Sequence, residues 1–183
     1  MYLKRASLVA AGLLALAVQP AMSEVTCDVG ETLVPVSGKA LNNAVHPGMT
    51  LGVIHLNVGT GKNVEKIKCG LTGSGGVDAN TGTIGFVHSF VCDDQVVFPM
   101  TGETVHSQLI MNTAGQSYME ACPDGYPPGA ATGSFQETSV PIAGTGRGIF
   151  DGVERGEIHV DGTINCLFSI DMKFTGEVCL PTM

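Results

Sequence analysis

The sequence predicts an all-β protein: a single antiparallel barrel of about eight strands stabilised by disulfides, with a β-sandwich as the alternative. Three observations favour this fold class. Apolar and polar residues alternate with the period of two that strands show, and the chain beyond residue 23 lacks a convincing amphipathic helix pattern. Glycine, at 25 residues, has almost twice its usual share, which suits bulges and corners in a strongly bent sheet. The six cysteines form an even set.

Residues 1–23 have the pattern of a secretory signal peptide. Lys4 and Arg5 precede a short apolar run, and a small-x-small cleavage site ends the segment at Ser23. The apolar run is shorter than the roughly 20 residues that a membrane span needs, and no second long apolar run follows. We therefore expect an exported protein, periplasmic or extracellular, without a membrane span. Residues 24–183 are then a single all-β domain.

The charge of the chain bears on its partners. The formal net charge is −8, and signal removal would take away two of the nine basic residues and none of the 17 acidic ones. Nucleic acids and anionic lipid headgroups bind to positively charged faces. Neither is therefore an expected partner of this protein.

Ten segments are predicted as strands, and their order along the chain favours a meander. The clearest alternation lies in residues 83–92, where apolar residues, His88 and Cys92 share one face. Segments rich in Gly, Pro, Asn and Asp, at 72–82 and 122–133, are predicted turns or loops. The ten predicted strands are residues 32–36, 49–59, 64–71, 83–92, 95–100, 103–111, 116–121, 132–142, 156–164 and 166–179.

The cysteines indicate up to three disulfides rather than a metal site, because the chain has no close C-x-x-C pair. Six cysteines allow 15 pairings, and the sequence does not choose among them. In our preferred arrangement, one disulfide joins the two ends of the domain, a second crosses one hairpin, and the third joins the remaining two cysteines. These pairs are Cys27–Cys179, Cys69–Cys92 and Cys122–Cys166.

A glycine-rich stretch begins at Gly144 and invites comparison with a nucleotide-binding loop. A dinucleotide loop needs G-x-G-x-x-G between a strand and a helix, but the third glycine position holds Ile149. The residues that follow alternate as a strand rather than a helix. We therefore expect a turn between two strands, with Ile149 and Phe150 closing one end of the barrel.

The same stretch resembles the turn GTG-x-F-x-G-x-x-G of the allene oxide cyclase and dirigent barrel superfamily. The matching residues are Gly144, Gly146, Phe150, Gly152 and Gly156, with one extra residue before the phenylalanine. The resemblance implies an eight-stranded, calycin- or dirigent-like barrel. It also implies, as an activity, a cyclase or isomerase without a redox cofactor. It places no catalytic residue on this chain.

Candidate binding residues lie on the predicted strands. Phe86, His88 and Phe90 share a face that would give the barrel interior an apolar wall with one polar group. Were His55 and His106 to point inward as well, the three histidines would be able to hold a metal or transfer protons. Outward-facing or individually hydrogen-bonded histidines are the favoured alternative, and we expect no metal and no cofactor.

Three functions follow from these observations. The first is binding of a small apolar or amphipathic molecule inside the barrel. The second is a structural or interaction role in the cell envelope or a secreted coat, and the third is the cyclase or isomerase of the resemblance. The sequence leaves open whether the protein is an enzyme, what its ligand is, and whether it forms an oligomer.

Overall fold

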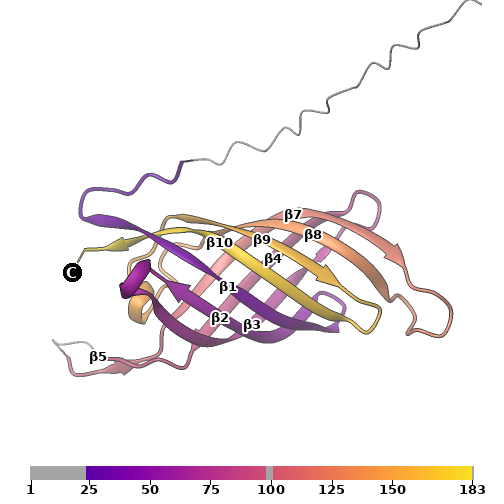
Figure 1. The fold of residues 1–183 in the computed structure, drawn as a ribbon, viewed down its shortest axis with the longest axis horizontal. Coiled ribbons are helices and arrows are strands. Elements are labelled where there is room, and N and C mark those ends of the chain that lie inside the picture. The colour runs from indigo at the N-terminus through magenta and orange to yellow at the C-terminus, as the bar shows by residue number, and fades with distance from the viewer. Residues whose placement is uncertain (1–23, 98–100, 183) are drawn as a thin grey trace, which may run out of the picture.

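The computed structural model describes residues 24–97 and 101–182 and confirms the predicted fold class. Eight antiparallel strands close into a barrel, in the order β1-β10-β9-β8-β7-β4-β3-β2 (Figure 1). Each barrel strand pairs with the next along the chain, and the last returns to the first, as in the expected meander. The predicted signal peptide, residues 1–23, lies outside the described residues. Within the described part of the chain, no helix has the length and apolarity to cross a membrane.

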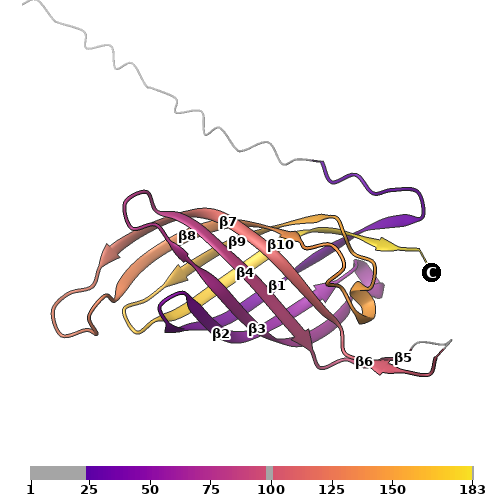
Figure 2. The same cartoon turned by 180° about the vertical axis from the view of Figure 1, so that it is seen from behind.

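The strands are long for a globular protein, so that the barrel is much longer than it is wide (Figures 1 and 2). A small two-stranded sheet, β5–β6, projects from one end of it. The barrel strands are β1 (Glu31–His46), β2 (Met49–Val58), β3 (Glu65–Val77), β4 (Thr83–Cys92), β7 (Gln108–Ala121), β8 (Ala131–Pro141), β9 (Gly156–Ile164) and β10 (Ser169–Pro181). The others are β5 (Val96–Val97), β6 (Thr104–Val105) and the 3-10 helices η1 (Gly61–Asn63) and η2 (Gly148–Phe150).

Several predicted boundaries differ from the structure, because alternation within a segment does not show which strand it pairs with. The predicted strand 32–36 is only the start of β1, which continues to His46. The predicted strands 103–111 and 116–121 belong mostly to one strand, β7, which pairs with both β4 and β8. The predicted strand 95–100 contributes only the short β5, outside the barrel, and its residues 98–100 lie outside the described residues. Strand β3 also runs to Val77, into the segment 72–82 that was predicted as a turn, because its glycines pair with β4.

Alternation along the strands separates the interior from the outer wall, as predicted. In β4, Ile84 and Phe90 are buried, whereas Val87 and Val91 are exposed. In β10, Ile170 is buried and its neighbour Asp171 is exposed. The buried side chains of all eight strands form one continuous apolar cluster.

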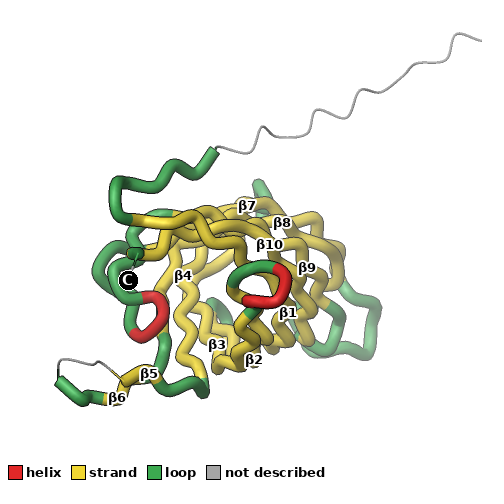
Figure 3. The backbone as a smooth tube through the Cα atoms, turned by 60° about the vertical axis from the view of Figure 1, so that its left-hand side comes forward, coloured by secondary structure: helices red, strands yellow, loops and turns green. Residues whose placement is uncertain are grey.

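The two ends of the barrel are built differently, and we name them for that difference. The plug end carries the long connection from β8 to β9, residues 142–155, together with both 3-10 helices (Figure 3). The hairpin end carries the turns β1–β2, β3–β4 and β9–β10 and the loop β7–β8. The plug is Phe150, which is 1% exposed and meets the ring of Phe90 edge to face at 5.5 Å. This confirms the expected position of Phe150 at one end of the barrel.

Glycines let the plug connection turn back on itself. Gly144 and Gly152 have left-handed φ angles of 75° and 76°, which glycine adopts without strain. Gly146 approaches the carbonyl oxygen of Phe150 too closely to allow a side chain, and a Cβ at Gly156 would lie 2.8 Å from Val178. These close approaches account for the glycines of the stretch without any phosphate.

The three disulfides form the preferred arrangement, and none of the described cysteines is free. Cys27–Cys179 ties the N-terminal segment to β10 at the plug end, across a sequence separation of 152 residues. Cys69–Cys92 joins directly paired residues of β3 and β4. Cys122–Cys166 links the β7–β8 loop to the β9–β10 turn at the hairpin end.

Candidate functional site

The barrel interior contains two adjoining cavities. The larger, of about 170 Å³, lies at the hairpin end and reaches the surface, because the exposed residues His46, Met49 and Val77 form part of its lining. The smaller, of about 60 Å³, lies toward the plug and is lined by Phe90 and Phe150 among others. Side chains that line both cavities include His88, Glu137 and Met172, which stand at the junction.

His88 on β4 projects into the interior and is fixed there by its neighbours. Its Nδ1 atom lies 3.0 Å from Thr113 Oγ1, which is itself hydrogen-bonded to Ser139 Oγ at 2.7 Å. The imidazole stacks on the Phe86 ring with a centroid distance of 5.6 Å. Burial lowers the pKa of His88 from 6.5 to about 4, so the side chain is neutral at physiological pH.

Space for the His88 ring comes from a glycine on the adjacent strand. Gly73 of β3 pairs with His88, and a Cβ there would lie 2.9 Å from both Cδ2 and Nε2 of the imidazole. The same Cβ would also collide with the Thr50 hydroxyl. The missing side chain at Gly73 therefore allows two polar side chains to face the interior next to each other.

Glu137 on β8 is the second ionisable group at the junction. The residue is 7% exposed, and its Oε2 atom is buried without a hydrogen-bond partner. Burial raises the pKa of Glu137 from 4.5 to about 7. A carboxyl group with this pKa can take up or release a proton near neutral pH, as a general acid or base must.

Asn42 on β1 adds a third polar group to the hairpin-end cavity. Its Nδ2 atom donates a hydrogen bond to Thr50 Oγ1 at 2.9 Å, while its Oδ1 atom is buried and unpaired. In the described part of the chain, Asn42 Oδ1 and Glu137 Oε2 are the buried side-chain oxygen or nitrogen atoms that lack a partner. Both line the same cavity, and buried polar atoms are normally paired.

The structure brings together only some of the residues that the sequence suggested. Phe86, His88 and Phe90 share the interior face of β4. His55 on β2 and His106, just before β7, are exposed instead, so the three histidines do not converge. His55 follows the buried Ile54, and one step along a strand moves a side chain to the other face.

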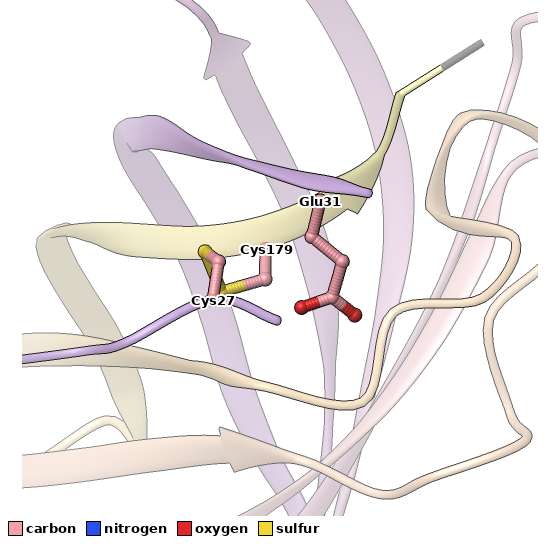
Figure 4. Close-up of side chains that lie close together, drawn as sticks. All are labelled: Cys27, Glu31 and Cys179. Atoms are coloured by element: carbon pink, nitrogen blue, oxygen red, sulfur yellow. A yellow bond between two sulfur atoms is a disulfide. The ribbon is translucent and has the colours of Figure 1, made fainter. Parts of the chain in front are cut away.

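Among the described residues, only one group of at least three His, Cys, Asp or Glu residues has its ligand atoms close together. It consists of Cys27, Glu31 and Cys179 (Figure 4). The two sulfur atoms are joined in a disulfide and offer no thiolate for a metal. Glu31 has a structural role, because its carboxylate accepts a hydrogen bond from the backbone of Asp28 at 2.8 Å and lies 3.8 Å from Arg155.

The outer wall has features of its own. Exposed apolar side chains cluster on the first strands, where Leu41 pairs with Val53 across β1 and β2. Gly70 lies between Val53 and Val91 in the pairing register and leaves a shallow groove of about 380 Å³. An interaction role would use this surface, but nothing in the structure indicates what would cover it.

Sequence reasoning missed the polar side chains around His88. Strand β8 is polar on both faces, since Glu137 and Ser139 point inward while Gln136 and Ser134 point outward. Alternation therefore gave no sign of which face was interior. The pairing register of β7 with β8, which places Thr113 opposite Ser139, is the information that was missing.

Comparison with protein-family models, with curated proteins and with solved structures gave no match to this chain. The resemblance to the allene oxide cyclase and dirigent superfamily therefore stays a prediction.

Proposed function

We propose that this protein is an exported barrel that binds one small amphipathic molecule in its interior, entering at the hairpin end. The observation that carries the proposal is the cavity of about 170 Å³ that reaches the surface and contains the unpartnered carboxylate oxygen of Glu137. An apolar cavity of about 150 Å³ holds a molecule the size of benzene. The expected ligand is therefore small, with an apolar body and one polar group.

The residues that line the cavity support a ligand with an apolar body and one polar group. Most of the wall is apolar, whereas four polar side chains line the cavity from different strands: Asn42, Thr50, His88 and Glu137. A mostly apolar pocket with a few placed polar groups is typical of small-molecule sites. The apolar wall would bury the body of the ligand, and the polar groups would fix its orientation.

Benzyl alcohol is a suitable first probe, because its ring fits the cavity and its hydroxyl group can reach a polar partner. We expect saturable binding at one site, measured by isothermal titration calorimetry. Ala44 lines the cavity at β1, so Ala44→Leu should fill the entrance and abolish binding. The matched control is Asn43→Leu, which adds the same side chain on the exposed outer face.

Two results would contradict the proposal. One is the absence of saturable binding to the wild-type protein at solubility-limited probe concentrations. The other is equal binding to wild type and to a folded Ala44→Leu variant, which would place the probe outside the lumen.

A further inference from the structure

The polar part of the site has an unusual imbalance of charge. Neither cavity lining contains a lysine or an arginine, although Glu137 stands at their junction. The ionisable side chains in the two linings of the described structure are His46, His88 and Glu137. His46 sits at the exposed rim, where its Nδ1 atom donates to the carbonyl oxygen of Pro47 at 3.1 Å.

His88 does not supply the missing positive charge. Its ring is held between Phe86 and Thr113, and burial keeps it in the neutral form. Glu137 is therefore a buried carboxyl group without a cation in the protein. A buried carboxylate without a partner is costly, and the energetic penalty falls when a cation or a strong donor reaches it.

The unpartnered atoms also share one chemical character. Glu137 Oε2 and Asn42 Oδ1 are both hydrogen-bond acceptors without a donor. The cavity therefore lacks donors rather than acceptors. An ammonium group carries three donors, no acceptor and a positive charge. A hydroxyl group carries one donor and no charge, and a carboxylate ligand would add a further negative charge beside Glu137.

We propose that the lumen is selective for a small apolar primary amine, whose ammonium group pairs with the Glu137 carboxylate. This proposal rests on the proposed function, because it specifies the head group of the ligand that the same cavity binds. The apolar body of the amine would occupy the space between Ile84, Ile164 and Met172. The negative net charge of the chain would favour the approach of a cation over that of an anion.

The test uses three probes of nearly the same size: benzylamine, benzyl alcohol and ethylbenzene. Binding of each is measured by calorimetry at pH 8 and pH 5.5 to wild type, Glu137→Gln and the control Glu120→Gln. Glu120 lies on β7 and is exposed, so its substitution removes the same charge outside the lumen. Circular dichroism would show that each variant is folded.

At pH 8 we expect benzylamine to bind wild type at least about tenfold more tightly than benzyl alcohol. Glu137→Gln should weaken benzylamine binding at least about tenfold more than it weakens benzyl alcohol binding, which removes the preference, whereas Glu120→Gln should keep the preference. The preference should shrink at pH 5.5, where Glu137 is protonated and His88 is still neutral.

The outcomes separate the two proposals. Equal binding of amine and alcohol, or an amine preference that survives Glu137→Gln, would overturn the amine proposal and leave the binding function intact. Failure of all three probes to bind wild type would overturn the binding function and the amine proposal with it.

Discussion

The plug end and the hairpin end of the barrel use the same strands for different purposes. At the plug end, Phe150 and Val153 are fully buried, and the backbone amide of Ile149 donates to Ser107 Oγ at 3.0 Å. At the hairpin end, polar side chains and Gly48 line the larger cavity, and two acceptors are left unpaired. The plug end has the smaller of the two cavities, whereas the hairpin end has the larger one, which is the proposed binding site.

The plug connection is held by a polar network that the sequence did not suggest. Ser107 is completely buried and hydrogen-bonds through its hydroxyl group to Asp94. The Asp94 carboxylate also accepts from the backbone amide of Ser107 at 3.1 Å. This network fastens residues that follow β4 to the η2 turn, so Asp94 stabilises the plug.

The largest expected difference between the ends comes from removing one phenylalanine at each. Phe150→Ala should lower the free energy of unfolding by about 3–5 kcal/mol, because the ring is 1% exposed and its loss enlarges the small cavity that it borders. Phe86→Ala should cost clearly less, since that ring is only half-buried and borders the larger cavity, which reaches the surface. Urea unfolding of both variants measures this, and equal losses would contradict the proposed division between the ends.

The pH dependence of stability should report on the buried carboxyl group. The folded state raises the pKa of Glu137, so its stabilising contribution is full below pH 4.5 and is lost as the pH rises to about 7. The free energy of unfolding of Glu137→Gln, minus that of wild type, should therefore increase by about 3 kcal/mol from pH 4 to pH 8.

In the wild-type curve the contribution of Glu137 should be partly cancelled, because His88 acts in the opposite direction. Its lowered pKa gives a contribution that is full above pH 6.5 and lost as the pH falls to about 4. Urea unfolding at several pH values should show this cancellation. A difference between Glu137→Gln and wild type that stays constant with pH would contradict the burial of the carboxyl group.

A third comparison lies within strand β3. Gly73→Ala should cost about 1–3 kcal/mol, because the new methyl group collides with the His88 ring and the Thr50 hydroxyl. Gly76→Ala on the same strand is the control, since a Cβ there meets nothing within 4 Å. Thermal unfolding of the two variants checks the difference, and similar melting temperatures would show that His88 is not held against β3.

The disulfides at the two ends should differ by a smaller amount. The disulfide Cys27–Cys179 closes a loop with a sequence separation of 152 residues, whereas Cys122–Cys166 closes one of 44. Replacing both cysteines of a pair by alanine removes the corresponding loop closure. Loop-closure entropy predicts that the first pair contributes about 1 kcal/mol more to the free energy of unfolding. Chemical unfolding of the two double variants tests this, and a larger loss at the hairpin end would refute it.

The sequence was informative where one face of a strand was clearly apolar. The alternation of β4 was enough to place Phe86, His88 and Phe90 on the interior wall, and the glycine stretch was enough to predict Phe150 as a plug. The preferred disulfides were also confirmed, although the spacing of the cysteines had not selected them.

The candidate site was harder to predict because it depends on pairing between strands. Glu137 becomes a buried, unpartnered carboxyl group only when β8 is placed between β7 and β9 in a particular register. The role of Gly73, which is to leave space for the His88 ring, follows only from the pairing of β3 with β4. The residues of a single strand do not determine which residues of a distant strand pair with them. The sequence alone therefore did not identify Glu137 and Gly73 as residues of the site.

Binding of a small molecule inside the hairpin end of the barrel is the proposal from which the other expectations for this cavity follow. Nuclear Overhauser effects between benzyl alcohol and the methyl groups of the protein would test it most directly. We expect contacts from the aromatic protons of the probe to Ile84, Ile164 and Met172. Contacts to the exposed methyl groups of Leu41 and Val53 instead would place the probe on the outer wall and contradict binding in the lumen.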